Sequence, residues 1–427
     1  MPQPCPAPSF VRPLIAVLWL ASATLAHAAP ADIRALAQQE QQPLLDTLRD
    51  LVQIESGSKD LDGLNQIAAR IAGQLKQLGG AVEILQTTDI YRLDDTPEKI
   101  GPAVQAVFKG TGSAKIMLIA HMDTVYLKGM LKDQPFRVDG DKAYGLGIAD
   151  DKQGIATILH SVALLQKLNF KDYGTLTVLI NGDEEISSPG WRSTITRVAS
   201  EQDAVFSFEG SDASGTLRLA TSGIGSAYLT VHGKSSHAGA RPEGGVNALY
   251  ELSHQVLQMK DLSKPEQGLK LNWTVSKSGT NRNVIPAEAT AQADARALKV
   301  SDFNELETAL QDKIKNRLLP DSKVEVKFEV RRPPLEASDA SRRVAGHGKT
   351  IYQEFGMPLN VAERATGGGT DAAFAALKSK GSVVEGMGLS GFGAHSNDAE
   401  YVQINSIVPR LYLTTRMIMD LSDGKVK

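Results

Sequence analysis

The sequence predicts an α/β protein with a smaller α+β domain inserted into it. Helical periodicity and buried strand-like runs alternate over residues 31–208 and return after residue 338, which is typical of a sheet covered by helices. Between them, from about residue 222, the expected order is strand, helix, strand, strand, helix, strand, which is the ferredoxin-like order. A chain of 427 residues is long enough to form two cores.

Hydrophobic spacing defines the elements of both parts. In the second helix, apolar residues from Leu64 to Leu78 recur every three or four positions, and Gly79-Gly80 ends it. In the larger part we expect helices at 31–53, 61–78, 152–168, 190–200, 338–355 and 404–420, and strands at 81–85, 103–108, 115–120, 174–180, 204–208 and 382–386. In the inserted part we expect strands at 225–233, 270–278, 288–296 and 323–330, and helices at 245–259 and 302–317. The prolines of RRPP (331–334) force an extended exit from it.

The N-terminus predicts a signal peptide. Arg12 precedes an apolar run at 14–26, and AHAA (26–29) fits the small-x-small cleavage rule, with cleavage after Ala28 or Ala29. A membrane anchor is the alternative, but the run is shorter than the roughly 20 residues needed to span a bilayer. We therefore expect a periplasmic or secreted protein without a membrane segment after cleavage. The predicted division is 1–28 signal peptide, 29–221 and 334–427 catalytic domain, and 222–333 inserted domain.

Composition excludes several classes of protein. With 42% hydrophobic and 22% charged residues, the chain is typical of soluble globular proteins. A formal net charge of −3 and the lack of a long basic run argue against a nucleic-acid surface. The only cysteine, Cys5, lies in the predicted signal peptide, so disulfides, a thiol nucleophile and thiolate metal ligands are excluded for the mature chain.

Three acidic clusters follow strands or turns between residues 121 and 185. In HMDTVY (121–126), Asp123 lies two residues after His121, so both side chains point the same way in an extended chain and Asp123 could hold the far imidazole nitrogen. The alternative is an exposed His-Asp turn. In GIADDKQG (147–154), Asp150 and Asp151 precede a helix and could simply be caps. In NGDEE (181–185), the alternative is an exposed acidic loop.

The three clusters together are stronger evidence for a site than each one alone, because the predicted strands would bring all of them to one edge of one sheet. Glu209 follows a further strand, and His395 lies in a Gly-rich loop before the last helix. So many carboxylates repel one another unless a cation compensates, and two metal ions explain their number better than one. Four other histidines are not assigned to the site: His160, His232, His254 and His347.

The motifs resemble the co-catalytic di-zinc metallopeptidases, which include glutamate carboxypeptidase, aminoacylase and succinyl-diaminopimelate desuccinylase. The likeness is closest to the bacterial glutamate carboxypeptidases, the folate-hydrolysing carboxypeptidase G group, and it covers nearly the whole mature chain. The segments that carry it are HMDTVY, GLGIADDKQG (145–154), NGDEE, SFE (207–209), TSGI (221–224), SHAGA (236–240), NVIPA (283–287), RATGGGTDAA (364–373) and GFGAHS (391–396).

The resemblance implies a zinc-exopeptidase domain with a lid that also forms a homodimer. Two Zn²⁺, or cobalt in their place, would be held by Asp150 as the bridge, with His121 and Glu209 completing one site and Glu185 and His395 the other. Asp123 would orient His121, and the Asp150–Asp151 peptide bond is expected to be cis. Glu184 would be the general base and acid, and His237 would reach the oxyanion in the partner's active site. The alternative for His237 is a structural loop before a helix.

Substrate recognition is implied by the same resemblance. Arg296 and Asn283 match positions that bind the free carboxylate, with an ordinary lid ion pair as the alternative for Arg296. TGGGTDA (366–372) offers the backbone N–H groups of Gly368, Gly369 and Thr370. The expected reaction is hydrolysis of the amide bond to a C-terminal amino acid, glutamate first, in folates or N-acyl and peptidyl substrates.

At a few positions the sequence departs from the pattern of the glutamate carboxypeptidases, and these differences put the glutamate preference in question. Gly210 replaces the usual proline after Glu209, which should loosen that loop. Residues 211–220 differ where a basic residue would meet the glutamate γ-carboxylate, and Arg218 or Arg332 could substitute. A broader aminoacylase or dipeptidase is the alternative enzyme. A non-catalytic binding protein would be expected to lack the base or a ligand, yet Glu184 and all five implied ligands are present.

Overall fold

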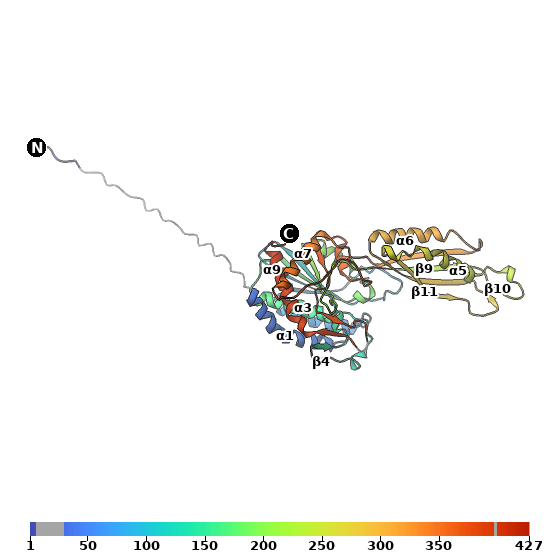
Figure 1. Cartoon of the computed structure of the whole chain (residues 1–427), viewed down its shortest axis with the longest axis horizontal. Helices are drawn as coiled ribbons and strands as arrows, with labels where there is room; N and C mark the ends of the chain where they lie inside the picture. The colour runs from blue at the N-terminus through green and yellow to red at the C-terminus, as the bar shows by residue number, and fades with distance from the viewer. Residues whose placement is uncertain (6–29, 397–398, 427) are drawn as a thin grey trace.

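Two sheets organise the computed structural model, which describes residues 1–5, 30–396 and 399–426. Figure 1 shows a larger α/β part, and beside it an elongated part that carries α5, α6, β9 and β11. We call the elongated part the lid. The predicted signal peptide and its cleavage site lie almost wholly outside the described residues, so its prediction stays untested.

The larger part is built on a six-stranded sheet. Its last four strands are parallel, so their carboxyl ends meet at one edge, with His121 opposite Asn181 and Ile119 opposite Ser207. The first two strands run antiparallel to their neighbours. In spatial order the strands are β1 (Ala81–Leu85), β2 (Ala103–Lys109), β6 (Thr175–Asn181), β3 (Lys115–His121), β7 (Ala204–Ser207) and β16 (Ser382–Val384).

Helices cover both faces of this sheet because its central strands are apolar on both sides. In β3, Ile116 and Leu118 enter one core, whereas Met117 and Ile119 enter the other. The first core is shared with α1 (Pro30–Val52), α2 (Leu61–Gln77), α3 (Gln153–Lys167), α7 (Asp339–Gln353) and α9 (Ile407–Ser422). The second is shared with α4 (Arg192–Ala199) and α8 (Ala372–Ala376).

The lid is a four-stranded antiparallel sheet with two helices. Alternate residues of its central strand are buried, and α5 and α6 contact each other and the same sheet, so one face carries the core. The spatial order is β11 (Lys270–Ser278), β13 (Glu288–Ala297), β9 (Gly223–His232) and β14 (Lys323–Arg332), with α5 (Ala248–Met259) and α6 (Val300–Lys313). Helix α5 begins three residues later than predicted, because the Asn247 side chain caps it by accepting from Leu249 N at 3.0 Å.

Short strands that the sequence did not predict tie the loops around the sheet edge. They are too short, at two or three residues each, to show a period. A four-stranded sheet in the order β17 (Gly391–Phe392), β18 (Tyr401–Gln403), β5 (Lys142–Tyr144) and β4 (Arg137–Asp139) brings the His395 loop to the Asp150 loop. Two smaller pairs join β8 (Leu217–Arg218) to β15 (Val361–Ala362), and β10 (Ser236–His237) to β12 (Val284–Ile285).

The predicted fold class is confirmed: an α/β domain carries an inserted lid of ferredoxin-like order. All the main helices and strands that the sequence predicted are present, with ends shifted by a few residues. The exact domain boundaries at 221/222 and 333/334 stay a prediction. Within the described part of the chain, no helix has the length and apolarity to cross a bilayer.

Candidate active site

Six ionisable side chains meet at the carboxyl edge of the parallel strands. They form two groups, and within each group the ligand-type atoms all lie within 4.8 Å of one another. His121, Glu184 and Glu209 make the first group; Asp150, Glu185 and His395 make the second. His121 ends β3, Glu184 and Glu185 follow β6 in the short turn η3 (Glu184–Ile186), and Glu209 follows β7.

Asp150 links the two groups through its two oxygens. Its Oδ1 lies 3.0 Å from His121 Nε2, and its Oδ2 lies 3.1 Å from His395 Nε2. His121 Nε2 is also 3.4 Å from Glu209 Oε1, and His395 Nε2 is 3.1 Å from Glu185 Oε2. One carboxylate therefore faces two imidazoles, each of which faces a second carboxylate. This is the arrangement that a bridging ligand between two cations requires.

The potential between these side chains is strongly negative. Hydrogen bonds to Asp150 and Glu185 raise the pKa of His395 to about 11. Burial opposes protonation of His121, but Glu209, Asp123 and Asp150 together raise its pKa well above the usual range. Burial and the nearby Asp150 raise the pKa of Glu185 to about 7. A cation would be stabilised at this point.

The donor set fits divalent metal ions. Glu185 Oε1 is buried and has no hydrogen-bond partner, so this oxygen has a free lone pair at the centre of the site. Imidazole nitrogen and carboxylate oxygen without sulfur suit zinc and similar divalent ions. Since both groups combine these donors, the residues present fit the metal binding that the sequence predicted.

Asp123 lies beneath the site, where it fixes His121 and the turn that follows β6. His121 Nδ1 is 3.0 Å from the Asp123 backbone carbonyl and 3.3 Å from its carboxylate, which favours the tautomer with Nε2 free. The carboxylate accepts hydrogen bonds from Glu184 N at 2.9 Å and Glu185 N at 3.1 Å, and from Ser58 Oγ at 2.8 Å. An exposed His-Asp turn is excluded, because His121 is 2% and Asp123 0% exposed.

Glu184 is buried beside Arg332, which the sequence offered as a candidate partner of the substrate γ-carboxylate. Its carboxylate accepts a hydrogen bond from Arg332 Nη1, and Arg332 Nη2 donates to its backbone carbonyl at 2.6 Å. Arg332 is itself 2% exposed and lies 3.6 Å from Asp371 Oδ1. Burial raises the pKa of Glu184 well above its usual range although Arg332 opposes it, which suits a general base. Arg332 is therefore paired within the chain, because a buried guanidinium needs carboxylate partners.

The Asp150 loop is held by a residue whose role the sequence did not reveal. Glu400, fully buried, accepts hydrogen bonds from Gly147 N at 3.0 Å, Ala149 N at 2.7 Å and Asp150 N at 3.1 Å. The peptide bond between Asp150 and Asp151 is cis, as the resemblance implied. The capping alternative for these two acids is wrong, because α3 begins at Gln153 without a side-chain cap and Asp151 is buried.

Arg296 links the lid to the Gly-rich loop. Its guanidinium forms a fork to the Asp294 carboxylate, with both contacts at 2.9 Å, and donates to the Gly367 carbonyl at 3.2 Å. It therefore forms the lid ion pair that was the alternative, while 31% of its side chain stays exposed. A Cβ at Gly368 would meet no atom within 4 Å, whereas one at Gly369 would lie 2.7 Å from the Ser222 carbonyl. Gly368 thus leaves open space for a ligand.

His237 and Asn283 lie together but apart from the six-residue cluster. They belong to the segments around the β10–β12 pair, where Ala238 N donates to the Asn283 carbonyl at 2.9 Å. Figure 1 shows β10 at the end of the lid farthest from the α/β part. The His237 Nδ1 accepts from Gly239 N and Ala240 N, both at 3.1 Å, so its Nε2 carries the proton and remains a donor.

Arg218 supports the loop that Gly210 was expected to loosen. Its Nη2 donates to the Gly210 carbonyl at 2.7 Å and lies 3.5 Å from Glu385 Oε1. Glu385 is fully buried and also accepts from Thr370 Oγ1 at 3.1 Å. Burial raises the pKa of Glu385 to about 7, and Arg218 opposes that rise. Arg218 is thus engaged inside the chain rather than free for a substrate carboxylate.

Comparison with known proteins identifies the family. Residues 117–420 match the family described as Peptidase family M20/M25/M40. The chain belongs to this family. It is 43% identical over 424 residues to Carboxypeptidase G2 of Pseudomonas sp. (strain RS-16), a match that covers 98% of this chain and all of that protein. The chain is thus a metallo-carboxypeptidase-type hydrolase, an exopeptidase of the M20 family.

Solved structures share the fold at lower identity. The tripeptidase of Staphylococcus aureus matches with a TM-score of 0.73 at 20% identity, covering 90% of this chain and 99% of its own. The M20 family metallo-carboxypeptidase Sso-CP2 of Sulfolobus solfataricus matches with a TM-score of 0.68 at 16% identity, over 88% and 98% of the two chains. These neighbours confirm the fold and leave the substrate open.

Proposed function

We propose that this enzyme binds two Zn²⁺ ions and removes a C-terminal glutamate from folates or other N-acyl substrates. The observation that carries the proposal is Asp150, whose two oxygens face His121 and His395 on opposite sides. The 43% identity to a protein named Carboxypeptidase G2 supports the substrate class. Bound at these two groups, zinc would polarise the scissile carbonyl and acidify a water molecule, and cobalt is expected to substitute.

Glu184 is the residue that moves protons in this proposal. Its carboxylate would accept a proton from the attacking water and pass it to the leaving amine, and burial, which raises its pKa, strengthens it as a base. Arg332 orients this carboxylate through two hydrogen bonds, one to the side chain and one to the backbone. The chain thus holds its base in a fixed position, in contact with the first group of candidate metal ligands.

The free carboxylate of the substrate would bind on the lid side. The Arg296 guanidinium and the backbone of Gly368, Gly369 and Thr370 form this side, and the open space above Gly368 admits a ligand. His237 and Asn283 lie together at one end of the lid, apart from the six-residue cluster of their own chain. They would therefore act in the active site of a second subunit. A homodimer through the lid is therefore part of the proposal, as is export to the periplasm or medium.

The test is release of C-terminal amino acids from methotrexate, N-acyl-glutamate, N-acyl-leucine and Ala-Glu, with zinc and after chelation. We expect cleavage of the two glutamate substrates that stops on chelation. Glu184→Gln should lower kcat by about 10²- to 10⁴-fold while the metal content stays unchanged. Glu201→Gln, the same change on an exposed side chain, is the matched control.

A broader aminoacylase or dipeptidase is the second candidate. The observation in its favour is that Arg218 and Arg332 are both engaged inside the chain, so neither is free for a γ-carboxylate. Cleavage confined to N-acyl-leucine or Ala-Glu would establish this candidate and remove the glutamate assignment. Metal-independent cleavage, or an active Glu184→Gln, would overturn the shared mechanism.

A further inference from the structure

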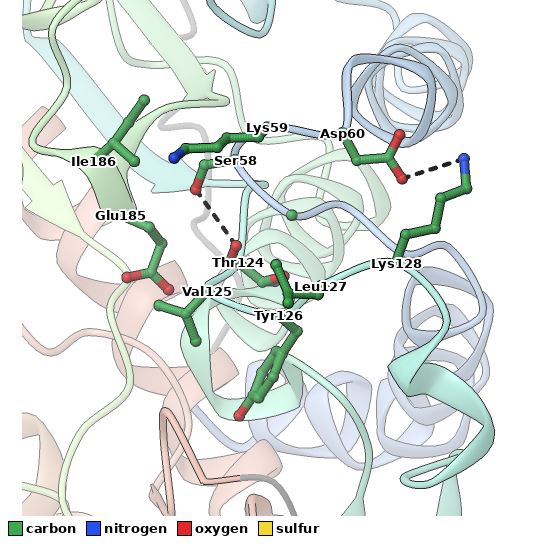
Figure 2. Close-up of a pocket in the computed structure, with 11 residues that line it drawn as sticks. Ser58, Lys59, Asp60, Thr124, Val125, Tyr126, Leu127, Lys128, Glu185 and Ile186 are labelled. Carbon is green, nitrogen blue, oxygen red and sulfur yellow. Dashed lines mark hydrogen bonds and ion pairs between the residues drawn. The ribbon is translucent and has the colours of Figure 1, made fainter. Parts of the chain in front are cut away.

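A cavity of about 530 Å³ adjoins the candidate metal cluster on the side of Glu185. It is formed by two segments, residues 57–60 and 124–128, together with Glu185 and Ile186 (Figure 2). The second segment is the continuation of the HMDTVY motif, whose last residues the proposed mechanism does not use. Cavities of this size hold drug-sized molecules and exceed what an acetyl group or a small side chain needs.

The cavity and the lid approach the cluster through different residues. Glu184 contacts Arg332 of the lid strand β14, whereas the next residue, Glu185, forms part of the cavity wall. Ser58, also in the wall, donates its hydroxyl to Asp123 beneath the cluster. A substrate that holds its C-terminal residue at the lid and its scissile carbonyl at the cluster would place its acyl group in this cavity.

Part of the lining is apolar. Val125 is 40% and Leu127 74% exposed, although both are large hydrophobic side chains, and Ile186 belongs to the same lining. Exposed apolar side chains gathered at one cavity indicate a ligand that covers them. Covering this surface with an apolar group would contribute favourable free energy in proportion to the area removed from water.

The charges of the cavity discriminate against a free amine. Figure 2 shows the Lys128 amine facing Asp60, at 3.6 Å, and Lys59 is an exposed side chain of the same wall. Asp60 also accepts from Gly63 N at 3.2 Å as the cap of α2. The other acid among the described lining residues is Glu185, which belongs to the candidate metal cluster. No lining carboxylate of the described chain is thus left to pair with an α-ammonium, which Lys59 would repel.

We propose that this cavity is the acyl subsite, and that it selects substrates whose N-terminal side is an uncharged, extended apolar or aromatic acyl group. Lys59 is the specificity-determining residue that disfavours a free α-amine, and Leu127 supplies apolar contact. The inference rests on the proposed function for its leaving group, and it makes the enzyme a deacylating carboxypeptidase rather than a dipeptidase.

The test compares two substrates that differ only in the presence of a charged α-ammonium group. Hydrocinnamoyl-glutamate and phenylalanyl-glutamate share every heavy atom except the α-ammonium nitrogen. For the wild type, kcat/KM should be about tenfold higher for hydrocinnamoyl-glutamate, which corresponds to about 1.4 kcal/mol. In Lys59→Glu the ratio should fall to about one, because repulsion becomes attraction. Lys132→Glu, the same charge change on an exposed neighbouring side chain outside the cavity, should keep the wild-type ratio.

A second variant tests the apolar contact. Leu127→Asp should reduce the kcat/KM ratio of hydrocinnamoyl-glutamate over acetyl-glutamate by about fivefold or more, since the acetyl group is too short to reach the side chain. Leu127 is exposed, so the variant should fold as the wild type does, and the thermal melting curve checks this. Wild-type ratios in both Lys59→Glu and Leu127→Asp would overturn the proposal.

The leaving amino acid is varied in a separate experiment. A failure of the glutamate assignment can then be distinguished from a failure of the acyl subsite. With the acyl group fixed as hydrocinnamoyl, the glutamate and leucine derivatives are compared. If leucine is preferred, the glutamate assignment fails, and the Lys59 and Leu127 comparisons are repeated on leucine derivatives. If glutamate is preferred but the wild type cleaves the free amine and the acylated substrate equally, the acyl subsite fails alone.

Discussion

The two candidate metal-binding groups are held in different ways. His121 ends a central strand of the six-stranded sheet, is 2% exposed, and has its Nδ1 fixed by Asp123. The side chain of His395 is 56% exposed and lies on a loop, with φ at +63°, two residues after Gly393 at +85°. The first group is thus anchored in the sheet, and the second is completed by a loop. Asp150 is the residue that joins them.

The difference predicts unequal affinity for metal. A ligand whose side chain is already fixed loses little conformational entropy on binding, whereas a loop must be ordered. A non-glycine residue in the left-handed region also carries a cost of roughly 1–2 kcal/mol, which metal binding must offset. We therefore expect the group with His121 to bind metal more tightly than the group with His395.

The largest expected effect follows from removing the link. Asp150→Ala should lower the metal content towards zero and kcat by about 10³-fold or more, because each imidazole loses its shared carboxylate. Metal analysis after dialysis, together with kcat, measures both. Asp139→Ala, the same change on a side chain that is 78% exposed, is the control. An Asp150→Ala variant that still binds two metal ions tightly would contradict the role of Asp150 as the link between the two groups.

The second effect separates the two groups. His395→Ala should keep about one metal ion per chain after dialysis, whereas His121→Ala should keep none, because its loss removes the anchored ligand. Both variants should fall at least about 10²-fold in kcat. Stoichiometry by elemental analysis decides the outcome, and melting curves check that each variant folds. The reverse stoichiometry would show that the loop, not the sheet, sets the affinity.

The sequence predicted the anchored group more fully than its surroundings. His121, Glu184 and Glu209 each follow, or nearly follow, a continuous apolar run, so the ends of the predicted strands located them. The contacts of Glu400 and Arg218 depend on how distant segments pack, and no local pattern reports that. Arg332 was one of two candidates for the substrate γ-carboxylate, because its burial beside Glu184 cannot be read from a strand end.

The contact between helices α1 and α3 should contribute to stability in a way that depends on pH. Glu40 of α1 is buried and accepts a hydrogen bond from His160 Nδ1 of α3, the helix that follows Asp150. That bond holds the pKa of Glu40 below its ordinary value of 4.5, against the effect of burial. The ionised form is therefore the stabilising one, so its contribution is complete above about pH 4.5 and is lost as the pH falls.

Glu40→Gln should lower the free energy of unfolding by about 1–2 kcal/mol at pH 7, and this difference should shrink below pH 4.5. The contact with Lys167, which is 47% exposed, adds little to this figure. Urea unfolding at pH 7, 5 and 3.5 measures it, with the exposed Glu201→Gln as the control. A difference that stays constant with pH would mean that packing, not charge, accounts for the effect.

The smallest expected effect concerns the loop of His395. Burial raises the pKa of Tyr126, so its hydroxyl stays protonated and contacts both the Glu400 carboxylate at 2.5 Å and the Ser396 carbonyl at 2.8 Å. It therefore ties the His395 loop to the residue that holds the Asp150 loop. Tyr126→Phe should weaken the second metal ion about tenfold and leave the first unchanged.

Zinc titration of the metal-free enzyme measures both steps. Tyr91→Phe, which removes a hydroxyl from a side chain that is 48% exposed, should leave both unchanged. Equal weakening of the two steps in Tyr126→Phe would show that Glu400 transmits the change to Asp150 and hence to both groups. Weakening of the second step alone would establish that the loop can be tuned while the sheet holds the first ion in place.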